Sequence, residues 1–437
     1  MRVLRIHHDG RAPAQRTRDV ALAQLGVDVT LVVPRRWPQP DGEGSPPTDP
    51  RLIELPVRRV GDVNRHSYEA TVDALRRLID DAAPDLLDIH EEPFSVAARQ
   101  WLAAAPPELP VVMYTAQNID KRLPPPFAQY ERAAFDRVTA IYPCTAQAAS
   151  VVRGKGFAGL IEVLPLGFDD ATFLPGAQST DDDELVLSLV GRLVREKGVL
   201  DAVRVLARLH ARRPTRLLVV GSGPEASSAS ALAGELGVSE RLELLPWQST
   251  EELAVTYRRT HVALVPSRPT STWVEQFGRV IVEAQASGAV VAGYASGSIG
   301  EVAGEPALLT PVGDVSGLAD GIAAVVTNAA EFEARRAGGI AQSRTRTWEQ
   351  VAERQVELYR RVLRGDVPRM DRHQSPRRRR AAARAEWGLT ATSAAGVRPF
   401  ALPVLRGGGL LAAALGAAID GGAEARARLR RSPRARG

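Results

Sequence analysis

Residues 262 to 304 constrain the fold of this chain more than any other stretch. They begin with a short apolar run rich in β-branched residues, which Pro266 ends, and this pattern predicts a buried strand. A polar loop follows, and residues 279 to 287 then have the composition of a helix that Gly288 ends. A second apolar run leads into another glycine-containing turn. This order of strand, loop, helix and strand predicts a parallel α/β sheet, whose ligands bind at the carboxyl ends of the strands.

Two carboxylates mark that edge of the predicted sheet. Glu275 is expected in the loop and Glu283 in the second turn of the helix, so both can reach one ligand from different distances. The backbone N–H groups of residues 277 to 279 would point from the helix start toward an anion or a hydroxyl-rich ligand. Acidic residues are common in the first turns of helices, so the alternative is that Glu275 caps the helix and Glu283 faces solvent.

A cationic loop lies between a strand predicted at residues 185 to 190 and a helix predicted at 199 to 210. It contains Gly191, Arg192 and Lys197. Cationic side chains beside the free N–H groups of a helix start form an anion site. The chain has three lysines among 56 lysines and arginines, so a lysine in this loop runs against a strong arginine bias.

Together these motifs resemble the nucleotide-sugar site of the family-4 retaining glycosyltransferases, which have the GT-B fold. The resemblance implies an α/β architecture with two Rossmann-like β/α/β domains that face a central cleft. It implies catalytic roles for Arg192 and Lys197, which would hold the diphosphate, and for Glu275, which would lie at the donor sugar. The donor-binding residues that it implies are Gly10, Gly191, Gly221, Gly223, Phe277, Gly278, Arg279 and Glu283.

The first half of the chain also alternates strands and helices, without the Gly-x-Gly-x-x-Gly fingerprint of dinucleotide-binding proteins. Polar residues follow the strands predicted at 85 to 90 and 110 to 114, which places them where an acceptor is expected. These acceptor-side candidates are Glu91, Glu92, Gln117 and Asn118. Many family members carry a histidine about where Gln117 stands. Glutamine still forms hydrogen bonds but does not titrate, and simple turn chemistry is the alternative at this position.

No metal site and no cofactor are expected. His7 and His8 follow the first predicted strand, but no third ligand has suitable spacing in the sequence. Arg192, Lys197 and a helix start can neutralise the diphosphate, so the prediction is a metal-independent enzyme with the nucleotide sugar as co-substrate. Cys144 is the only cysteine, and its apolar surroundings predict an inert core thiol.

The sequence predicts five segments, and the last differs in charge from the others. The segments are an acceptor-binding domain at 1–168, a linker at 169–183, a nucleotide-sugar-binding domain at 184–346, a helix at 347–364 that crosses back to the first domain, and a tail at 365–437. The tail has 15 arginines and five acids, a net charge of +10. Because the whole chain has a formal charge of +5, the preceding body carries −5. This basic, alanine-rich composition predicts disorder, with contact to an anionic membrane as the alternative and nucleic acid less favoured.

The predicted function is retaining transfer of a sugar from a nucleoside-diphosphate sugar to a hydroxyl group of a carbohydrate or lipid-linked acceptor, in polysaccharide, glycolipid or other glycoconjugate synthesis. No leader and no apolar run near the roughly 18 residues of a membrane span are found, so a cytoplasmic location is expected, with peripheral contact at the inner face of the membrane. One alternative is another GT-B enzyme such as a nucleotide-sugar epimerase. The other is a non-catalytic protein that binds membrane or nucleic acid through its tail, against which the intact set of Arg192, Lys197, Glu275 and Glu283 argues.

Overall fold

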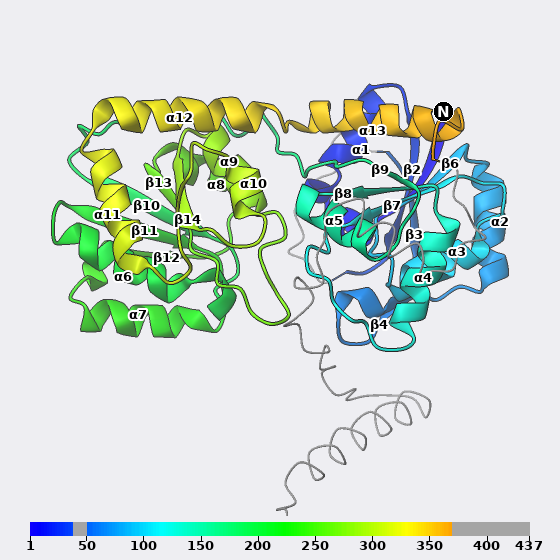
Figure 1. Ribbon diagram of the computed structural model, residues 1–437, viewed down its shortest axis with the longest axis horizontal. Coiled ribbons are helices and arrows are strands. Elements are labelled where there is room, and N and C mark those ends of the chain that lie inside the picture. The colour runs from blue at the N-terminus through cyan, green and yellow to red at the C-terminus, as the bar shows by residue number, and fades with distance from the viewer. Residues whose placement is uncertain (38–49, 369–437) are drawn as a thin grey trace, which may run out of the picture.

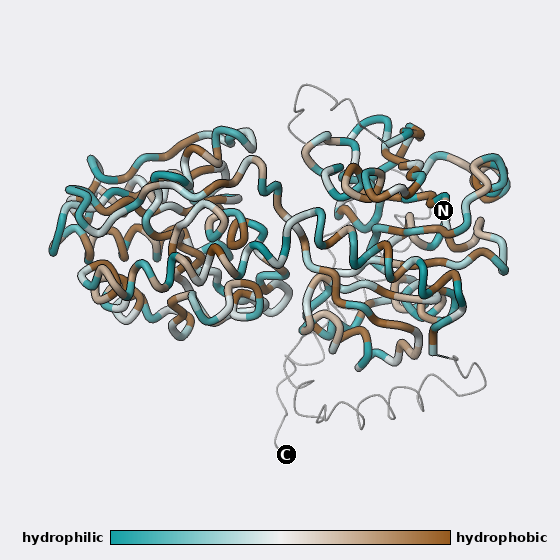
Figure 2. The backbone as a smooth tube through the Cα atoms, turned by 90° about the horizontal axis from the view of Figure 1, so that it is seen from above, coloured by the Kyte–Doolittle hydropathy of each residue, from teal (hydrophilic) through white to brown (hydrophobic). Residues whose placement is uncertain are grey.

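The computed structural model describes residues 1–37 and 50–368, which form two α/β lobes placed end to end (Figure 1). Most of the predicted tail, from residue 369 onward, lies outside the described residues. Seen from above, each lobe contains its own set of hydrophobic strands (Figure 2). Within the described residues, none of the helices has both the length and the apolar character needed to cross a membrane.

The first lobe is built on a seven-stranded parallel sheet of order β3-β2-β1-β6-β7-β8-β9. Its strands are β1 (Arg2–Ile6), β2 (Asp28–Pro34), β3 (Arg51–Leu55), β6 (Leu86–Ile89), β7 (Val111–Thr115), β8 (Ala140–Pro143) and β9 (Leu160–Ile161). Its helices are α1 (Thr17–Gln24), α2 (Val72–Ala82), α3 (Val96–Ala104), α4 (Phe127–Arg137) and α5 (Ala146–Gly154). A separate antiparallel hairpin joins β4 (Val57–Arg59) to β5 (His66–Tyr68). The strand order reverses between β1 and β6.

The second lobe has a six-stranded parallel sheet of order β12-β11-β10-β13-β14-β15. Its strands are β10 (Leu185–Val190), β11 (Thr215–Val220), β12 (Leu242–Leu245), β13 (Val262–Val265), β14 (Val290–Tyr294) and β15 (Leu308–Thr310). Its helices are α6 (Val199–His210), α7 (Glu225–Glu235), α8 (Thr250–Arg258), α9 (Arg279–Ala286), α10 (Ile299–Ala303), α11 (Val315–Val326) and α12 (Ala329–Arg344). Here the order reverses between β10 and β13. The predicted strand, loop, helix and strand of residues 262 to 304 are therefore β13, α9 and β14.

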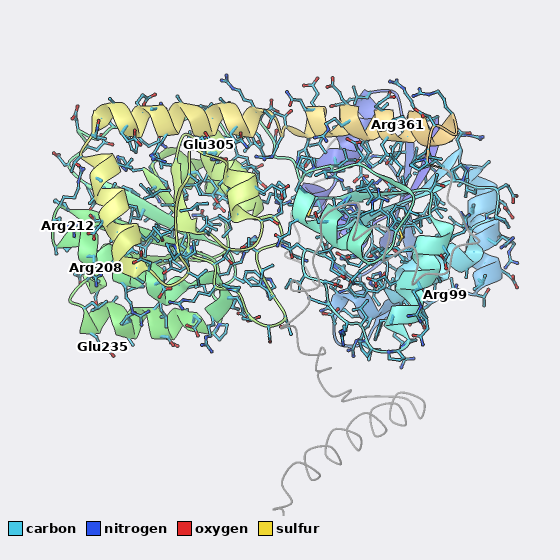
Figure 3. All side chains as sticks on the ribbon, viewed as in Figure 1. Arg99, Arg208, Arg212, Glu235, Glu305 and Arg361 are labelled. Atoms are coloured by element: carbon cyan, nitrogen blue, oxygen red, sulfur yellow. The ribbon has the colours of Figure 1, made fainter. Side chains whose placement is uncertain are left out.

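Helices cover both faces of each sheet, which explains why strands such as β13 and β14 consist of apolar residues. Every residue of β13 and β14 is buried, as expected for parallel strands between two layers of helices. The covering helices turn charged side chains outward. Figure 3 labels four of these side chains, Arg99, Arg208, Glu235 and Arg361, together with Arg212 and Glu305, which lie in the turns after α6 and α10.

The last helix, α13 (Trp348–Leu363), returns to the first lobe and packs on α1. Figure 1 shows α12 and α13 following one another along one side of both lobes. The apolar side of α13 joins a core cluster that includes Val356 and Val362. Its polar residues Gln355 and Tyr359 donate hydrogen bonds to the buried carboxylate of Asp88 in β6. Arg5 of β1 forms an ion pair with the same carboxylate, so the crossing helix is fixed to the centre of the first sheet.

Candidate active site

The cationic loop runs from the end of β10 to the start of α6. A 3-10 turn, Arg195–Lys197, leads into Gly198, which has φ 68° and is the N-cap of α6. A Cβ atom on Gly198 would lie 2.1 Å from the carbonyl oxygen of Pro266, so only glycine fits where this loop meets the end of β13. Arg192 is exposed and has no hydrogen-bond or ion-pair partner within residues 1–37 and 50–368. Its guanidinium group is therefore available to an anion at the helix start.

Lys197 and Glu275 form an ion pair across the ends of β10 and β13. The Nζ atom of Lys197 lies 2.7 Å from Oε2 of Glu275, and the Ser267 hydroxyl donates to the same oxygen at 2.9 Å. The side chains are 19% and 8% exposed. The lysine also lies 5.3 Å from the centre of the Trp273 ring. Oε1 of Glu275 accepts no hydrogen bond from the described part of the chain, so this oxygen is available to a ligand hydroxyl.

The second carboxylate, Glu283, lies on α9, the helix that follows the Glu275 loop. Glu283 is buried, which raises the pKa of its carboxyl, and the charge of Arg279 partly offsets that shift. The Nε atom of Arg279 lies 3.3 Å from Oε1 of Glu283, and its Nη1 donates to the Gln15 side chain in the first lobe. Phe277 is 3% exposed and packs in the core, which leaves only its backbone to face a ligand. Gly278 is the N-cap of α9.

Gly221 and Gly223, two of the glycines predicted to bind the donor, lie in the turn after β11. A Cβ atom on Gly221 would lie 2.0 Å from the carbonyl oxygen of Gly191, so the turns after β10 and β11 meet backbone to backbone. Gly223 approaches the Leu193 carbonyl in the same way. The turn therefore supports the cationic loop from the side. Gly10 lies elsewhere, buried in the 3-10 turn Asp9–Arg11 of the first lobe.

Asn118 of the first lobe contacts the Glu275 loop of the second lobe directly. Its Nδ2 atom donates to the backbone oxygen of Glu275 at 2.8 Å and lies 3.3 Å from the Ser298 hydroxyl. The Gln276 side chain reciprocates by donating to the carbonyl oxygen of Ala116. The segment after β7 and the segment after β13 are thus held together across the two lobes.

Gln117 is buried and is bonded within its own lobe. Its side-chain oxygen accepts a hydrogen bond from Lys155 at the end of α5, and Lys155 pairs with Glu131 at 2.7 Å. A cavity of 380 Å³ borders this group. Its charged lining consists of Asp120, Lys121, Arg122, Glu131, Arg132 and Lys155.

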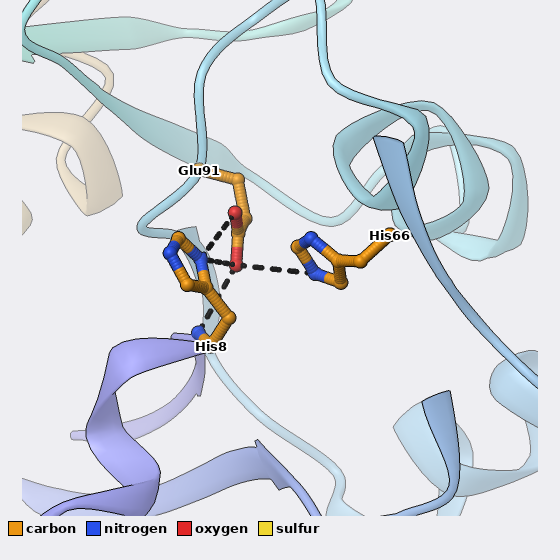
Figure 4. A group of neighbouring side chains, drawn as sticks. All are labelled: His8, His66 and Glu91. Carbon is orange, nitrogen blue, oxygen red and sulfur yellow. Dashed lines mark hydrogen bonds and ion pairs between the residues drawn. The ribbon is translucent and has the colours of Figure 1, made fainter. Parts of the chain in front are cut away.

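The adjacent acceptor-side candidates, Glu92 and Glu91, have different surroundings. Glu92 accepts from the Thr115 hydroxyl at 2.6 Å and from the Ala116 backbone N–H at 2.8 Å, so it fixes the end of β7. Burial raises the pKa of Glu92, and these hydrogen bonds oppose the shift. Glu91, which is 2% exposed, turns toward His8 and His66 (Figure 4).

His66 is the residue at this site that sequence reasoning missed. The sequence offers no third ligand of suitable spacing for His7 and His8, but the fold brings ligand atoms of His8, His66 and Glu91 within 4.8 Å of one another. His66 belongs to the β4-β5 hairpin, and no local motif signals that this hairpin brings it to the end of β1. Burial would lower the pKa of His8, but the nearby carboxylates of Glu91 and Asp9 raise it to about 10.

Comparison with known proteins gives matches over both lobes. The family model described as "Glycosyl transferases group 1" matches residues 170–342, and that of the "Glycosyl transferase 4-like domain" matches residues 15–167. A D-inositol 3-phosphate glycosyltransferase of Mycobacterium sp. (strain JLS) is 38% identical over 152 residues, 32% of this chain and 33% of that protein. One of Mycolicibacterium gilvum (strain PYR-GCK) is 33% identical over 221 residues, 46% of this chain and 49% of that protein. The chain thus spans a third to about half of the length of these relatives.

Solved structures cover more of the chain at lower identity. A sucrose-phosphate synthase from Thermosynechococcus elongatus aligns with 84% of this chain and all of its own, with a TM-score of 0.66 and 21% identity. The Anabaena HepE protein, determined in complex with UDP and glucose, aligns with 82% of this chain and 99% of its own, with a TM-score of 0.62 and 16% identity. These likenesses confirm the predicted GT-B arrangement of two α/β lobes.

Proposed function

The chain belongs to the group 1 glycosyl transferases, and from this premise we propose that it transfers a sugar from a nucleoside-diphosphate sugar to a hydroxyl group, with retention of anomeric configuration. The observation that carries the proposal is the arrangement at the carboxyl edge of the second sheet. An exposed Arg192, the Lys197–Glu275 pair and the start of α6 converge there. Such an edge is where open α/β sheets bind ligands.

Each part of the nucleotide sugar (diphosphate, sugar and ribose) has a counterpart among these residues. Arg192, Lys197 and the α6 N-terminus would bind the diphosphate, because all three present positive charge or N–H donors. The open Oε1 of Glu275 would accept a hydrogen bond from a sugar hydroxyl. Glu283, in its ionised form, would accept from the ribose hydroxyls. Two cations and a helix start neutralise the diphosphate, so we propose that donor binding itself needs no metal ion.

The proposed reaction needs no protein base. The bond between the anomeric carbon and the β-phosphate oxygen breaks, and the acceptor oxygen bonds to the same face of that carbon. The acceptor proton passes to the departing phosphate oxygen, which balances the step. Gln117 fits this scheme since it cannot titrate and is bonded to Lys155. Arg192 and Lys197 act where negative charge develops on the leaving diphosphate, the position at which fixed positive charge accelerates a reaction most.

For the acceptor, we propose a hydroxyl compound that carries an anionic group. The cavity beside Gln117 supports this, because four of the six charged side chains that line it are cationic. The relatives' names point the same way, since the compound in them, D-inositol 3-phosphate, is a phosphorylated polyol. A phosphorylated carbohydrate or a lipid-linked phosphate would have the same anionic chemistry. We also propose that the reaction takes place in the cytoplasm.

The test is a thermal-shift and hydrolysis screen of nucleoside-diphosphate sugars in the presence of a chelator. One donor should raise the melting temperature of the wild type, because a ligand that binds only the folded state stabilises it. The shift should persist in Arg195→Ala and disappear in Lys197→Ala. Adding acceptors should then give product, whose anomeric configuration is read by NMR. If no donor shifts the wild type, with or without acceptors, the proposal is wrong.

A further inference from the structure

Histidines concentrate at the carboxyl edge of the first sheet. Four of the seven in the chain gather there: His7, His8, His66 and His90. His8 follows β1 and Glu91 follows β6, and these are the two strands between which the sheet order reverses. At such a switch point the connections diverge to opposite faces and leave room for a ligand. His66 reaches the same place from the β4-β5 hairpin (Figure 4).

His66 presents a lone pair that has no hydrogen-bond partner. The side chain is 0% exposed, and its Nδ1 lies 2.8 Å from the carbonyl oxygen of Val63. A carbonyl only accepts, so Nδ1 carries a proton, and in the tautomer with a single N–H the other nitrogen, Nε2, is an acceptor. That Nε2 is buried without a hydrogen bond and lies 3.8 Å from Oε1 of Glu91. Two buried acceptors that face each other are unfavourable unless a proton or a metal ion lies between them.

His8 has a complementary arrangement around its two ring nitrogens. Its Nδ1 lies 2.7 and 2.8 Å from the two carboxylate oxygens of Glu91. Its Nε2 faces the other way, 3.4 Å from Asp9, whose second oxygen accepts from the Trp37 indole N–H at 3.0 Å. Metal-binding histidines usually donate their second ring N–H to a carboxylate or a backbone carbonyl, which fixes ring orientation and increases basicity. Asp9 provides this for His8, and Val63 provides it for His66.

We propose that Nδ1 of His8, Nε2 of His66 and the carboxylate of Glu91 bind a divalent transition-metal ion such as zinc. Two imidazoles and one carboxylate are a ligand set that suits zinc and its neighbours rather than magnesium or calcium. With metal–ligand bonds of about 2.0 to 2.2 Å, the His66 and Glu91 atoms must approach and those of His8 and Glu91 must separate by a fraction of an ångström. Binding would displace the proton between His8 and Glu91.

Three protein ligands leave one position of a tetrahedral site open. The side chain of His8 is 15% exposed, whereas those of His66 and Glu91 are 0% and 1% exposed, so the open position lies on the His8 side. An oxygen of the acceptor is the ligand expected there. That last role rests on the proposed function, but the metal binding does not. This site departs from the expectation of a protein that binds no metal. It lies in the first lobe, whereas the residues proposed to bind the diphosphate, Arg192 and Lys197, lie in the second.

The experiment measures metal binding alone, in the full-length chain without nucleotide sugar. Protein purified without a polyhistidine tag and stripped with chelator is titrated with Zn²⁺, and bound metal is measured by equilibrium dialysis and elemental analysis. The wild type should bind one ion per chain. Glu91→Gln and His66→Gln should each weaken that affinity at least tenfold. His210→Gln, the same substitution at a histidine of the second lobe, should leave it unchanged.

Trp37 provides a second readout in the wild-type fold, in case His66→Gln does not fold. Its ring centre lies 4.9 Å from that of His8 and 5.0 Å from that of His66. Co²⁺ bound at this site should quench tryptophan fluorescence with the stoichiometry found by dialysis, and Trp37→Phe should abolish most of that quenching. If folded wild-type protein takes up no ion, or if Glu91→Gln binds zinc as tightly as the wild type, the cluster is only an ion pair and the proposal is wrong.

Discussion

Lys197→Ala tests the donor site most directly, because the contacts of this lysine in the free protein are few: an ion pair with Glu275 and a position over the Trp273 ring. The substitution removes the cation that lies 2.7 Å from Glu275. With side chains 19% and 8% exposed, the pair lies between a surface ion pair, which contributes about 0 to 1 kcal/mol, and a buried one, whose disruption costs about 3 to 5 kcal/mol. We expect the free energy of unfolding of the free protein to fall by about 1 to 2 kcal/mol.

Donor binding should suffer more than stability. A hydrogen bond to a charged group contributes about 1.5 to 3 kcal/mol, and each 1.4 kcal/mol is tenfold in affinity, so the dissociation constant should rise by about 10- to 150-fold. The catalytic rate should fall by a further factor of about 100 to 1,000 if Lys197 stabilises the leaving diphosphate, the range found when one donor to a developing negative charge is removed. Calorimetry with the donor and initial-rate measurements separate the two effects.

The control is Arg195→Ala, in the same 3-10 turn as Lys197. It removes one positive charge two residues away from Lys197, but Arg195 is exposed and is not placed in the donor site. Its donor affinity should stay within about twofold of the wild type, since isolated surface charges are screened at physiological salt. If both variants weaken donor binding equally, the effect is the general field of the lobe, and the contact assigned to Lys197 is refuted.

Three further predictions concern other residues. Lowering the pH from 7 through the raised pKa of Glu283 should weaken donor binding, because the protonated carboxyl loses an acceptor for ribose, and Glu283→Gln should remove this pH dependence from calorimetric titrations. Cys144 has its pKa raised by burial to about 12, so about one thiol in 10,000 is ionised at pH 8, and iodoacetamide should label it only after denaturant unfolds the protein. Tyr359→Phe removes a hydrogen bond to buried Asp88 and should cost about 1.5 to 3 kcal/mol of stability in urea titrations, while the donor dissociation constant stays within twofold.

The second lobe was predictable in outline because its signals are local. The apolar runs that become β13 and β14 and the glycine that starts α9 are each readable within a few residues. That Lys197 and Glu275 both lie at the carboxyl edge of one sheet also followed from the expected α/β order, since each lies in the segment after a strand, but their ion pair was not predicted. That these two strands are direct neighbours is a property of the sheet order, which no local pattern contains.

The first lobe shows where such reasoning stops. Asp88 occupies a strand that otherwise consists of apolar residues, and its partners come from segments far apart in the sequence: Arg5, Tyr142, Gln355 and Tyr359. Gln117 was predicted to be an acceptor-side residue from its place after β7. Its hydrogen bond with Lys155 depends on where α5 ends, which the sequence around Gln117 does not contain. Such contacts are fixed by packing between distant segments. The burial that makes them stable also makes an unpaired polar group costly.

The two sheets nevertheless obey one rule, and it connects the donor site with the proposed metal site. Each sheet reverses its strand order once, between β10 and β13 in the second lobe and between β1 and β6 in the first. Lys197 and Glu275 follow β10 and β13, and His8 and Glu91 follow β1 and β6. In each lobe a cationic or titratable side chain thus meets a glutamate where diverging connections open the sheet edge. The equivalence argues that the His8–Glu91 cluster is a ligand site of the first lobe, as the Lys197–Glu275 pair is proposed to be for the second.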